Sequence, residues 1–437
     1  MVVSQGAFAV MVFTDRLFMS YIDAVHIAAA LGGGVASFFS ISLFMGLITY
    51  GNALVAQYYG SGDLGKCPRV VTQGVFIVIA SAPMLLAAAY FGGHAFDYLG
   101  HEPEQIPLEK VYFQILMAGS VFTLLKACLA SYFSGIGRTR IVMVGDLLGT
   151  ALNIPLSWVL IFGKFGVPEL GIGGAALGSV IATLFSIAVF LYFYLSLDHK
   201  RQFRVMESWR FDRGIMRRYL RLGAPSGLEA FMNTATFNVF LLLFQSYGVV
   251  QGAAMAIVFN WDMLSFIPMI GLNIGVMSLI GRFVGAGDLR LANQVISSGF
   301  VVALGYSSVL AVVFLLCRAS LVALFDTGED NFTAIQSLAE YMMIGLVTYM
   351  IADGIILISG GALRGAGDTR WVMITSTIVH WLMLGAQCYV ILFSDLGPRV
   401  SWWVFVAMLI TLALLYLGRL LGGTWRRPER LARVMRE

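Results

Sequence analysis

The chain has 437 residues, of which 59% are hydrophobic and only 12% are charged, and its formal net charge is +4 at pH 7. Soluble domains have about 45–50% apolar and about 25% charged residues. The composition therefore excludes a disordered chain and argues against a soluble enzyme, because so few charges could not cover its surface. The mean hydropathy of +0.84 is typical of a protein embedded in lipid, where about 20 apolar residues cross the hydrocarbon.

Twelve long apolar runs follow one another along the chain, separated by short polar breaks. We expect each run to be a membrane-spanning helix, because the strands of a membrane barrel would be about 10 residues long and would alternate apolar with polar residues. The runs are 2–20, 27–57, 70–94, 111–135, 141–163, 172–197, 222–246, 252–280, 294–317, 336–363, 371–394 and 400–420.

The chain begins directly in an apolar stretch without a basic segment before it, so no cleavable signal peptide is expected. The sequence leaves open whether the native chain starts upstream of Met1. Its four cysteines lie far apart with no CxxC or Cys/His spacing, which predicts neither a disulfide framework nor a metal site.

Lysine and arginine are distributed unevenly over the loops. The loops after the even-numbered runs, together with the C-terminal tail counted from Arg419, hold 22 of them, whereas the loops after the odd-numbered runs hold 4. Because basic residues gather on the cytoplasmic side of a membrane, we expect both termini and the central linker to lie in the cytoplasm.

Two motifs occur twice in the same order. GSGDL at 60–64 recurs as GAGDL at 285–289, and GIGRTRIVM at 135–143 recurs as GAGDTRWVM at 365–373, at offsets of 225 and 230 residues. Two ordered matches at nearly the same offset indicate an internal duplication.

The duplication predicts an all-α integral membrane protein with two six-helix lobes. The amino-terminal lobe is 1–197, a basic cytoplasmic linker follows at 198–218, and the carboxy-terminal lobe with its basic cytoplasmic tail is 219–437. Because each lobe has an even number of helices, we expect a pseudo-two-fold axis along the membrane normal, as in many transporters.

Four carboxylates, Asp15, Glu229, Asp262 and Asp353, fall well inside the predicted spans. A charge near the bilayer centre costs about 2.5–3.5 kcal/mol on insertion scales, so each is a candidate for ion or substrate binding, with a structurally paired carboxylate as the alternative. Asp353 precedes Arg364 by 11 residues, which places it about 16 Å from the inner boundary.

Helical spacing sets Glu229, Asn233 and Thr236 on one face of their span. This stripe is either part of a binding site or a set of hydrogen bonds that hold neighbouring helices together. Asp262 follows Trp261, and a substrate cation beside that ring is an alternative to a structural pairing of the carboxylate.

Other polar groups inside the spans are less informative. Lys126 could neutralise either Asp15 or Asp146, and the sequence does not decide between them. His380 lies in mid-span, where it could relay protons, because histidine changes charge near neutral pH, or be a hydrogen-bonded core residue.

The GSGDLG segment at 60–65 fits GxGxxG, but it follows a membrane helix and no GK[ST] motif is present, so no nucleotide site is predicted. No catalytic constellation is recognisable. We expect a transporter without a resident cofactor, driven by an ion gradient, and no enzyme.

Motifs spread over nearly the whole chain resemble those of the multidrug and toxic compound extrusion (MATE) transporters of bacteria. The matching segments are TDRLF at 14–18, AQYYG at 56–60, NIPL at 153–156, GIGGAA at 171–176, LGAPSGL at 222–228, FIPMIG at 266–271, and Asp353 with ALRG at 362–365.

This resemblance implies an exporter of organic cations or other amphiphiles in exchange for H⁺ or Na⁺. Asp15 is similar to the family's first-helix coupling carboxylate, and Asp353 to its tenth-helix carboxylate. Asn153 is similar to the fifth-helix asparagine near the amino-lobe cation site.

The sequence also departs from the family pattern. Many members have an acid eight residues after the seventh-helix proline, where this chain has Asn233, with Glu229 one turn earlier. We hypothesise that Glu229 or Asp262 supplies the missing charge. Some sodium-binding members place an aspartate where this chain has Ser157. The expected sodium ligands in the amino lobe are Asp15, Asn153, Ser157 and Ser179.

The alternative to drug export is a flippase or exporter of lipid-linked saccharides or another non-drug metabolite. Such a protein would hold a pyrophosphate with several cations, but the spans contain only Arg16 and Lys126 against four deep carboxylates. We therefore expect cationic small-molecule substrates, no nucleic-acid partner, and a monomer in the inner membrane. The sequence does not identify the substrate or decide between H⁺ and Na⁺.

Overall fold

The computed structural model describes residues 1–98, 103–326, 332–394 and 396–436, and these residues form helices and no strand. The amino lobe consists of α1 Val2–Ser20, α2 Ala24–Thr49, α3 Gly51–Gly60, α4 Lys66–Ala95, α5 Gln105–Ala118, α6 Ser120–Gly135, α7 Thr139–Phe162 and α8 Ile172–Tyr194. The carboxy lobe consists of α10 Arg213–Gln245, α11 Val249–Gly285, α12 Leu289–Ala323, α13 Phe332–Gly365, α14 Thr369–Cys388 and α15 Gly397–Leu421.

The helices confirm the twelve predicted spans. Within the described residues, 11 helical segments, with α2 and α3 counted as one, are long and apolar enough to cross a membrane. The pair α5 and α6, which bends by 45° at Gly119, makes up the number to 12. A side chain at Gly119 would collide with Val180 of α8, so glycine allows this bent span to pack closely against its neighbour.

Several helices are longer than the hydropathy pattern predicts. α10 begins at Arg213, inside the segment 198–218 that was expected to be a linker, because Asp212 caps it by accepting hydrogen bonds from the backbone N–H groups of Gly214 and Ile215. Charged residues are tolerated in helical turns that extend beyond the hydrocarbon, so hydropathy alone underestimates the length of such helices.

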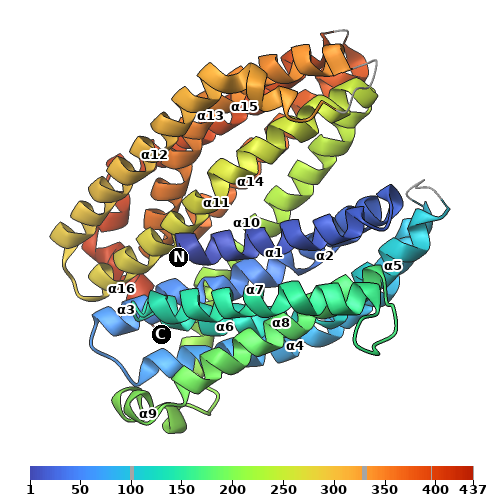
Figure 1. The fold of residues 1–437 in the computed structure, drawn as a ribbon. Helices are drawn as coiled ribbons and strands as arrows, with labels where there is room; N and C mark the ends of the chain where they lie inside the picture. Colours follow the sequence, from blue (N-terminus) through green and yellow to red (C-terminus); the bar gives the residue numbers. More distant parts are fainter. Residues whose placement is uncertain (99–102, 327–331, 395, 437) are drawn as a thin grey trace.

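The two lobes lie side by side and each has its own apolar core (Figure 1). One core cluster is built from apolar side chains between residues 240 and 425, which all belong to the carboxy lobe or its C-terminal extension. A second is built mainly from residues 41–222, with Met277 and Val434 as its contributions from further along the chain. All four cysteines are free thiols.

The lobes meet at one end of the bundle, which we call the closed end. There α3 crosses α11 so closely that a side chain at Gly60 would collide with the backbone oxygen of Arg282, and one at Gly285 with that of Gln57. Gly60 and Gly285 are equivalent positions of the repeat, and so are Gln57 and Arg282. The crossing therefore has the two-fold symmetry that the duplication predicts.

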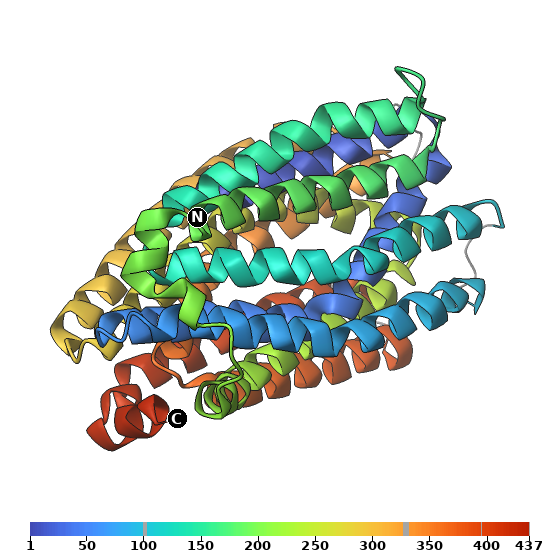
Figure 2. The same ribbon diagram turned by 90° about the horizontal axis from the view of Figure 1, so that it is seen from below.

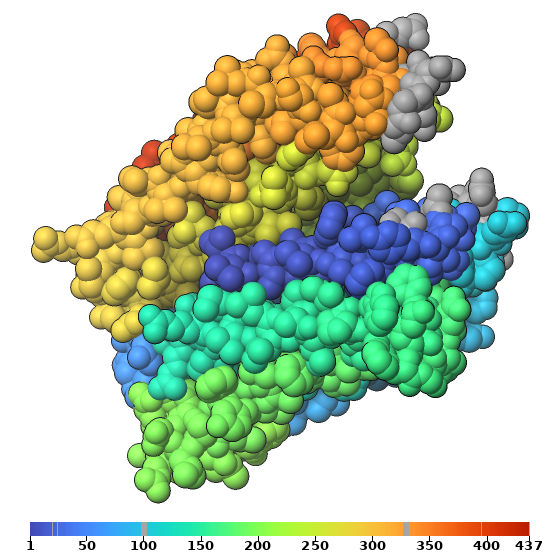
Figure 3. All heavy atoms as spheres, in the orientation of Figure 1, coloured from blue at the N-terminus to red at the C-terminus, as the bar shows by residue number. Residues whose placement is uncertain are grey.

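Hydrogen bonds between the lobes reinforce the closed end. The Gln57 side-chain amide donates to the carbonyl oxygen of Gly365 over 2.8 Å, and the Ser278 hydroxyl donates to that of Ser134 over 2.8 Å. Away from this end the lobes diverge, and the space-filling view shows a hollow between them (Figure 3). The molecule is thus closed at one end and open towards the other.

The C-terminal helix α16, Pro428–Met435, lies at the closed end and contacts both lobes (Figure 2). Its Val434 is buried in the amino-lobe core, whereas its Leu431 packs against the carboxy-lobe core. Arg218 of α10, which is 1% exposed, donates to the Val434 carbonyl oxygen over 2.9 Å and to Gln57 Oε1 over 2.6 Å.

The short helix α9, Leu197–Phe203, packs against the amino lobe at the same end. Its His199 is fully buried, with Nε2 2.8 Å from the Tyr132 hydroxyl and Nδ1 3.1 Å from Arg138 Nη1. Burial, followed by the positive charge of Arg138, lowers the pKa of His199 to about 4.

Candidate functional site

A polar cluster in the amino lobe brings together four side chains from three helices. Asp15 of α1 is 6% exposed, and its Oδ2 accepts a hydrogen bond of 2.9 Å from the Ser179 hydroxyl of α8. The Asn153 amide of α7 donates to Ser179 Oγ over 3.4 Å and to Ser157 Oγ over 3.2 Å. The structure thus places the four residues expected to bind Na⁺ in one cluster.

Close packing of α7 and α8 produces this cluster. A Cβ at Gly178 would lie 2.6 Å from Ser157 Oγ, so only glycine lets the two helices approach this closely. Two oxygens, Asp15 Oδ1 and Asn153 Oδ1, are buried, and in the described part of the chain no hydrogen-bond donor reaches them. A buried acceptor without a donor is costly, and a proton or a hard cation between these oxygens would remove that cost.

Lys126 is paired with Asp146 and not with Asp15. Its Nζ lies 2.8 Å from Asp146 Oδ1, and the Ser4 hydroxyl donates to the other oxygen of the same carboxylate. Lys126 therefore leaves the charge of Asp15 uncompensated, and the alternative that the sequence left open is resolved. Arg16 is exposed whereas Asp15 is buried, as expected for neighbours that point about 100° apart on a helix.

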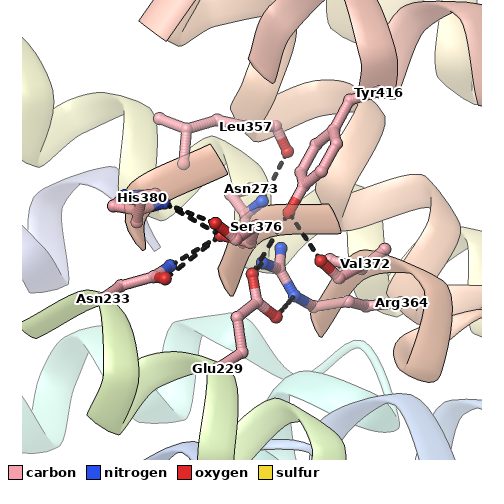
Figure 4. A network of polar contacts seen from close by, with 9 residues as sticks. All are labelled: Glu229, Asn233, Asn273, Leu357, Arg364, Val372, Ser376, His380 and Tyr416. Atoms are coloured by element: carbon pink, nitrogen blue, oxygen red, sulfur yellow. Dashed lines mark hydrogen bonds and ion pairs between the residues drawn. The ribbon is translucent and has the colours of Figure 1, made fainter. Parts of the chain in front are cut away.

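In the carboxy lobe, Glu229 lies at the centre of a network that joins α10 to three other helices (Figure 4). Its side chain is 4% exposed, and Arg364 of α13 binds both carboxylate oxygens, with Nη2 2.5 Å from Oε1 and Nε 3.3 Å from Oε2. The Tyr416 hydroxyl of α15 lies 3.2 Å from Oε1 and 3.3 Å from the carbonyl oxygen of Val372. The charge of Glu229 is therefore fully compensated.

Asn233 lies one turn after Glu229 on α10, and both Asn233 and His380 contact Ser376 of α14 (Figure 4). The Asn233 amide donates to Ser376 Oγ over 2.9 Å, and His380 Nδ1 lies 2.8 Å from the carbonyl oxygen of Ser376. Because a carbonyl can only accept, Nδ1 must carry the proton. His380 can then gain or release a proton only at Nε2.

Asp262 of α11 and Asp353 of α13 lie on two helices that pack against each other, and their charges interact electrostatically. Asp262 Oδ1 is buried, and no donor from the described residues reaches it. A cavity of about 10 Å³, the size of one water molecule, adjoins Asp353. It is lined by Ser265, Phe266, Met269, Ser307, Met350 and Asp353.

The ring of Trp261 packs edge-on against Phe314 of α12, with the ring centroids 5.8 Å apart. The indole is thus engaged in the helix packing. Among the described residues, no group of three or more His, Cys, Asp or Glu side chains is arranged to hold a metal ion, so a cation here would depend on mixed carboxylate, amide and hydroxyl oxygens.

Sequence reasoning did not identify the partners of Glu229. Arg364 stands in the ALRG motif at 362–365 and marks the inner boundary of its span, but nothing in the sequence pairs it with Glu229. Arg364 directly precedes the repeated glycine-rich turn, where the first half of the chain has Ser134, and this difference was an available signal. Tyr416 is one tyrosine in an apolar span and gives no signal of its own.

The sequence model of the MatE family matches residues 1–159 and 225–385 of the chain. The probable multidrug resistance protein NorM of Bradyrhizobium diazoefficiens is 26% identical over 408 residues, covering 92% of this chain and 87% of that protein. The multidrug resistance protein PmpM of Pseudomonas aeruginosa is 28% identical over 435 residues, covering 96% and 90%.

Solved structures show the same fold. A transporter of the MOP superfamily from Pyrococcus furiosus superimposes with a TM-score of 0.85 at 17% identity, covering 98% of this chain and 94% of that chain. An outward-facing MATE family transporter gives a TM-score of 0.83 at 18% identity, covering 100% and 95%. The chain therefore belongs to the MatE family, the transporters that its motifs resemble, and it is a multi-span membrane protein.

Proposed function

We propose that this protein exports organic cations or related amphiphiles and couples their export to the entry of H⁺ or Na⁺. The observation that carries this proposal is the contrast between its buried acids. Glu229 and Asp146 are ion-paired, whereas within the described residues Asp15, Asp262 and Asp353 have no basic partner. The relatives named as multidrug resistance proteins support drug export.

The coupling mechanism follows from desolvation. A carboxylate in a span is tolerated only when it is protonated, bound to a cation or paired. A cationic substrate and a coupling ion therefore compete for the same negative charges. Binding of the ion favours one arrangement of the lobes and releases the substrate, because a ligand shifts an equilibrium by its differential affinity for the two states.

In the carboxy lobe, Asp262 is the better candidate to replace the missing seventh-helix acid. The Arg364 guanidinium binds Glu229 through Nε and Nη2, so the carboxylate charge of Glu229 is already neutralised. Asp262 instead interacts with Asp353 and has a buried oxygen that no described donor reaches. We propose that Asp262 and Asp353 together take up the coupling ion or the cationic group of the substrate.

In the amino lobe, we propose that Asp15 takes up either a proton or Na⁺. The oxygens of Asn153, Ser157 and Ser179 around it would complete the shell of a sodium ion. His380 is proposed as a relay for protons through Nε2.

The lipid-linked saccharide alternative is disfavoured by Lys126. That proposal needs several free cations within the spans to hold a pyrophosphate, and pairing of Lys126 with Asp146 leaves Arg16 as the one other candidate in the predicted spans. Cationic cargo fits the remaining acids better.

We further propose a monomer without a resident cofactor and without enzymatic activity. Its place would be the inner membrane of a bacterium, since the named relatives are bacterial proteins. The closed end would face the cytoplasm together with both termini, because the turns and the tail at that end carry most of the basic residues.

The test is ethidium efflux from vesicles that contain the purified protein, with pH and Na⁺ gradients imposed separately. Efflux driven by the pH gradient alone would support proton antiport through Asp15 and Asp353. Efflux that requires Na⁺ would assign the amino-lobe cluster to sodium. No efflux under either gradient would contradict the proposed drug export and favour a non-drug cargo.

A further inference from the structure

The ion pair between Glu229 and Arg364 is built into the fold. The guanidinium approaches the carboxylate with two nitrogens, at 2.5 Å and 3.3 Å, in the fork geometry that gives such pairs their strength and direction. Tyr416 adds a third hydrogen bond from α15. Three helices of the carboxy lobe, α10, α13 and α15, are thereby joined at one carboxylate.

A glycine makes room for this pair. A Cβ at Gly360, one turn before Arg364 on α13, would lie 2.8 Å from Arg364 Nη1 and 3.2 Å from Tyr416 Cε2. The guanidinium folds back over this bare stretch of helix to reach α10. Since Gly360 is buried, a larger residue there would have to displace the guanidinium from Glu229.

The pair also determines where α10 places its next polar residue. Asn233 follows Glu229 by one turn on the same helical face, and its amide contacts Ser376, whose carbonyl oxygen holds His380. A shift of α10 at Glu229 would carry Asn233 away from Ser376. The ion pair and the polar chain are therefore mechanically linked through a single turn of helix.

We propose that Glu229 and Arg364 are positioning residues, which connect α10 to α13 and α15 through their side chains and thereby keep Asn233, Ser376 and His380 in register. The pair takes no part in ion or substrate binding. This role rests on the proposed efflux function and deepens it, because it separates one acid of the carboxy lobe from the two that exchange ions, Asp262 and Asp353.

The surroundings of Glu229 make this separation testable by pH. The charged or titratable groups that face it are Arg364 from α13, Tyr416 from α15 and, at longer range, His380 from α14. α2, which also packs against α10, carries one titratable residue, His26, bound to Asp23 at the start of that helix. Arg364 is thus the direct counter-ion of Glu229.

The experiment compares the pH profile of ethidium efflux for wild type, Glu229→Gln, Arg364→Gln and the double variant in vesicles, normalised to the amount of folded protein. Glu229→Gln should lower the rate but leave the pH midpoint of efflux unchanged. Arg364→Gln should lower the rate about tenfold and add a second titration step, because it leaves a buried acid without its counter-ion. The double variant should lose that step.

The exchanged pair, Glu229→Arg with Arg364→Glu, should recover part of the rate lost in Arg364→Gln. Asp353→Asn serves as the contrasting variant, since it should abolish coupled efflux. A shifted pH midpoint in Glu229→Gln would overturn the proposal and make Glu229 a coupling acid. The same conclusion would follow if Arg364→Gln gained no new titration step.

A second measurement keeps the pair testable if wild type moves no ethidium. In thermal unfolding of the purified proteins, Arg364→Gln should be the least stable variant. The double variant, which also carries Glu229→Gln, should be more stable than Arg364→Gln. That outcome with no efflux would leave the ion pair standing and reject only the export function. If the double variant were no more stable than Arg364→Gln, the proposed role of the ion pair in positioning α10 would be rejected.

Discussion

The hydroxyl of Ser179 donates to one oxygen of the Asp15 carboxylate over 2.9 Å, whereas no described donor reaches the other oxygen. Only one of the two carboxylate oxygens of Asp15 therefore has a hydrogen-bond donor. Its second oxygen is the atom at which a proton or a cation would bind.

Replacing Asp15 with asparagine should therefore abolish the part of efflux that depends on the amino lobe, and Ser179→Ala should weaken it less. Ethidium efflux under each gradient measures both. Ser186→Ala is a matched control, because this buried serine of α8 donates only to backbone carbonyls, at 3.1 Å from Gly145 and Ala182. Full efflux by Asp15→Asn would remove the amino-lobe cluster from the mechanism.

Asp353→Asn should eliminate coupled efflux while its abundance in the membrane stays near that of wild type. The amide keeps the shape of the side chain but cannot exchange an ion, and removing a charge from a span lowers the cost of insertion. Asp262→Asn should have a similar effect, because the two acids act on the same site. Normal efflux by the Asp353 variant would contradict this assignment.

Gly285→Val should destabilise the closed end, because its side chain would meet the backbone oxygen of Gln57. Overpacking of this kind costs about 1–3 kcal/mol, which should appear as a lower melting temperature in detergent. Gly275→Ala on the same helix is the control. It has open space around the position and should be neutral or stabilising, since alanine favours helix by about 1 kcal/mol over glycine.

Val434→Asp should release the C-terminal helix from the closed end. It would place a charge in an apolar core and remove the anchor that presents its carbonyl oxygen to the buried Arg218. We expect faster protease cleavage of residues 428–436 and a lower melting temperature. Exposed Arg433→Ala, on the same helix, should leave both unchanged. Equal cleavage of the two variants would argue against a docked tail.

The docking of α9 should depend on pH through His199. Its pKa is about 4 in the folded protein against an ordinary value of 6.5, so the folded state binds fewer protons than the unfolded one. Stability from this contact is complete above about pH 6.5 and is lost as the pH falls towards 4. His199→Gln should therefore be less stable than wild type at pH 7.5, with a gap that narrows by pH 5. A gap independent of pH would contradict this origin.

The sequence predicted the spans and the duplication because both depend on features that follow one another along the chain. The pairing of Lys126 with Asp146, and of Glu229 with Arg364, could not be predicted in this way. Each pair joins different helices, and which side chains meet depends on how those helices are rotated about their axes. The start of α10 at Arg213 was missed because a polar cap, Asp212, extends the helix beyond the apolar run.

The α3–α11 crossing is the kind of contact that two copies of one subunit make across a two-fold axis, where a patch binds its own twin. Gly60 meets Arg282 as Gly285 meets Gln57. A single unduplicated lobe would already possess a self-complementary surface for pairing with a second copy. The ancestor of this chain could thus have closed one end of its bundle as a homodimer, before the linker joined the two halves into one polypeptide.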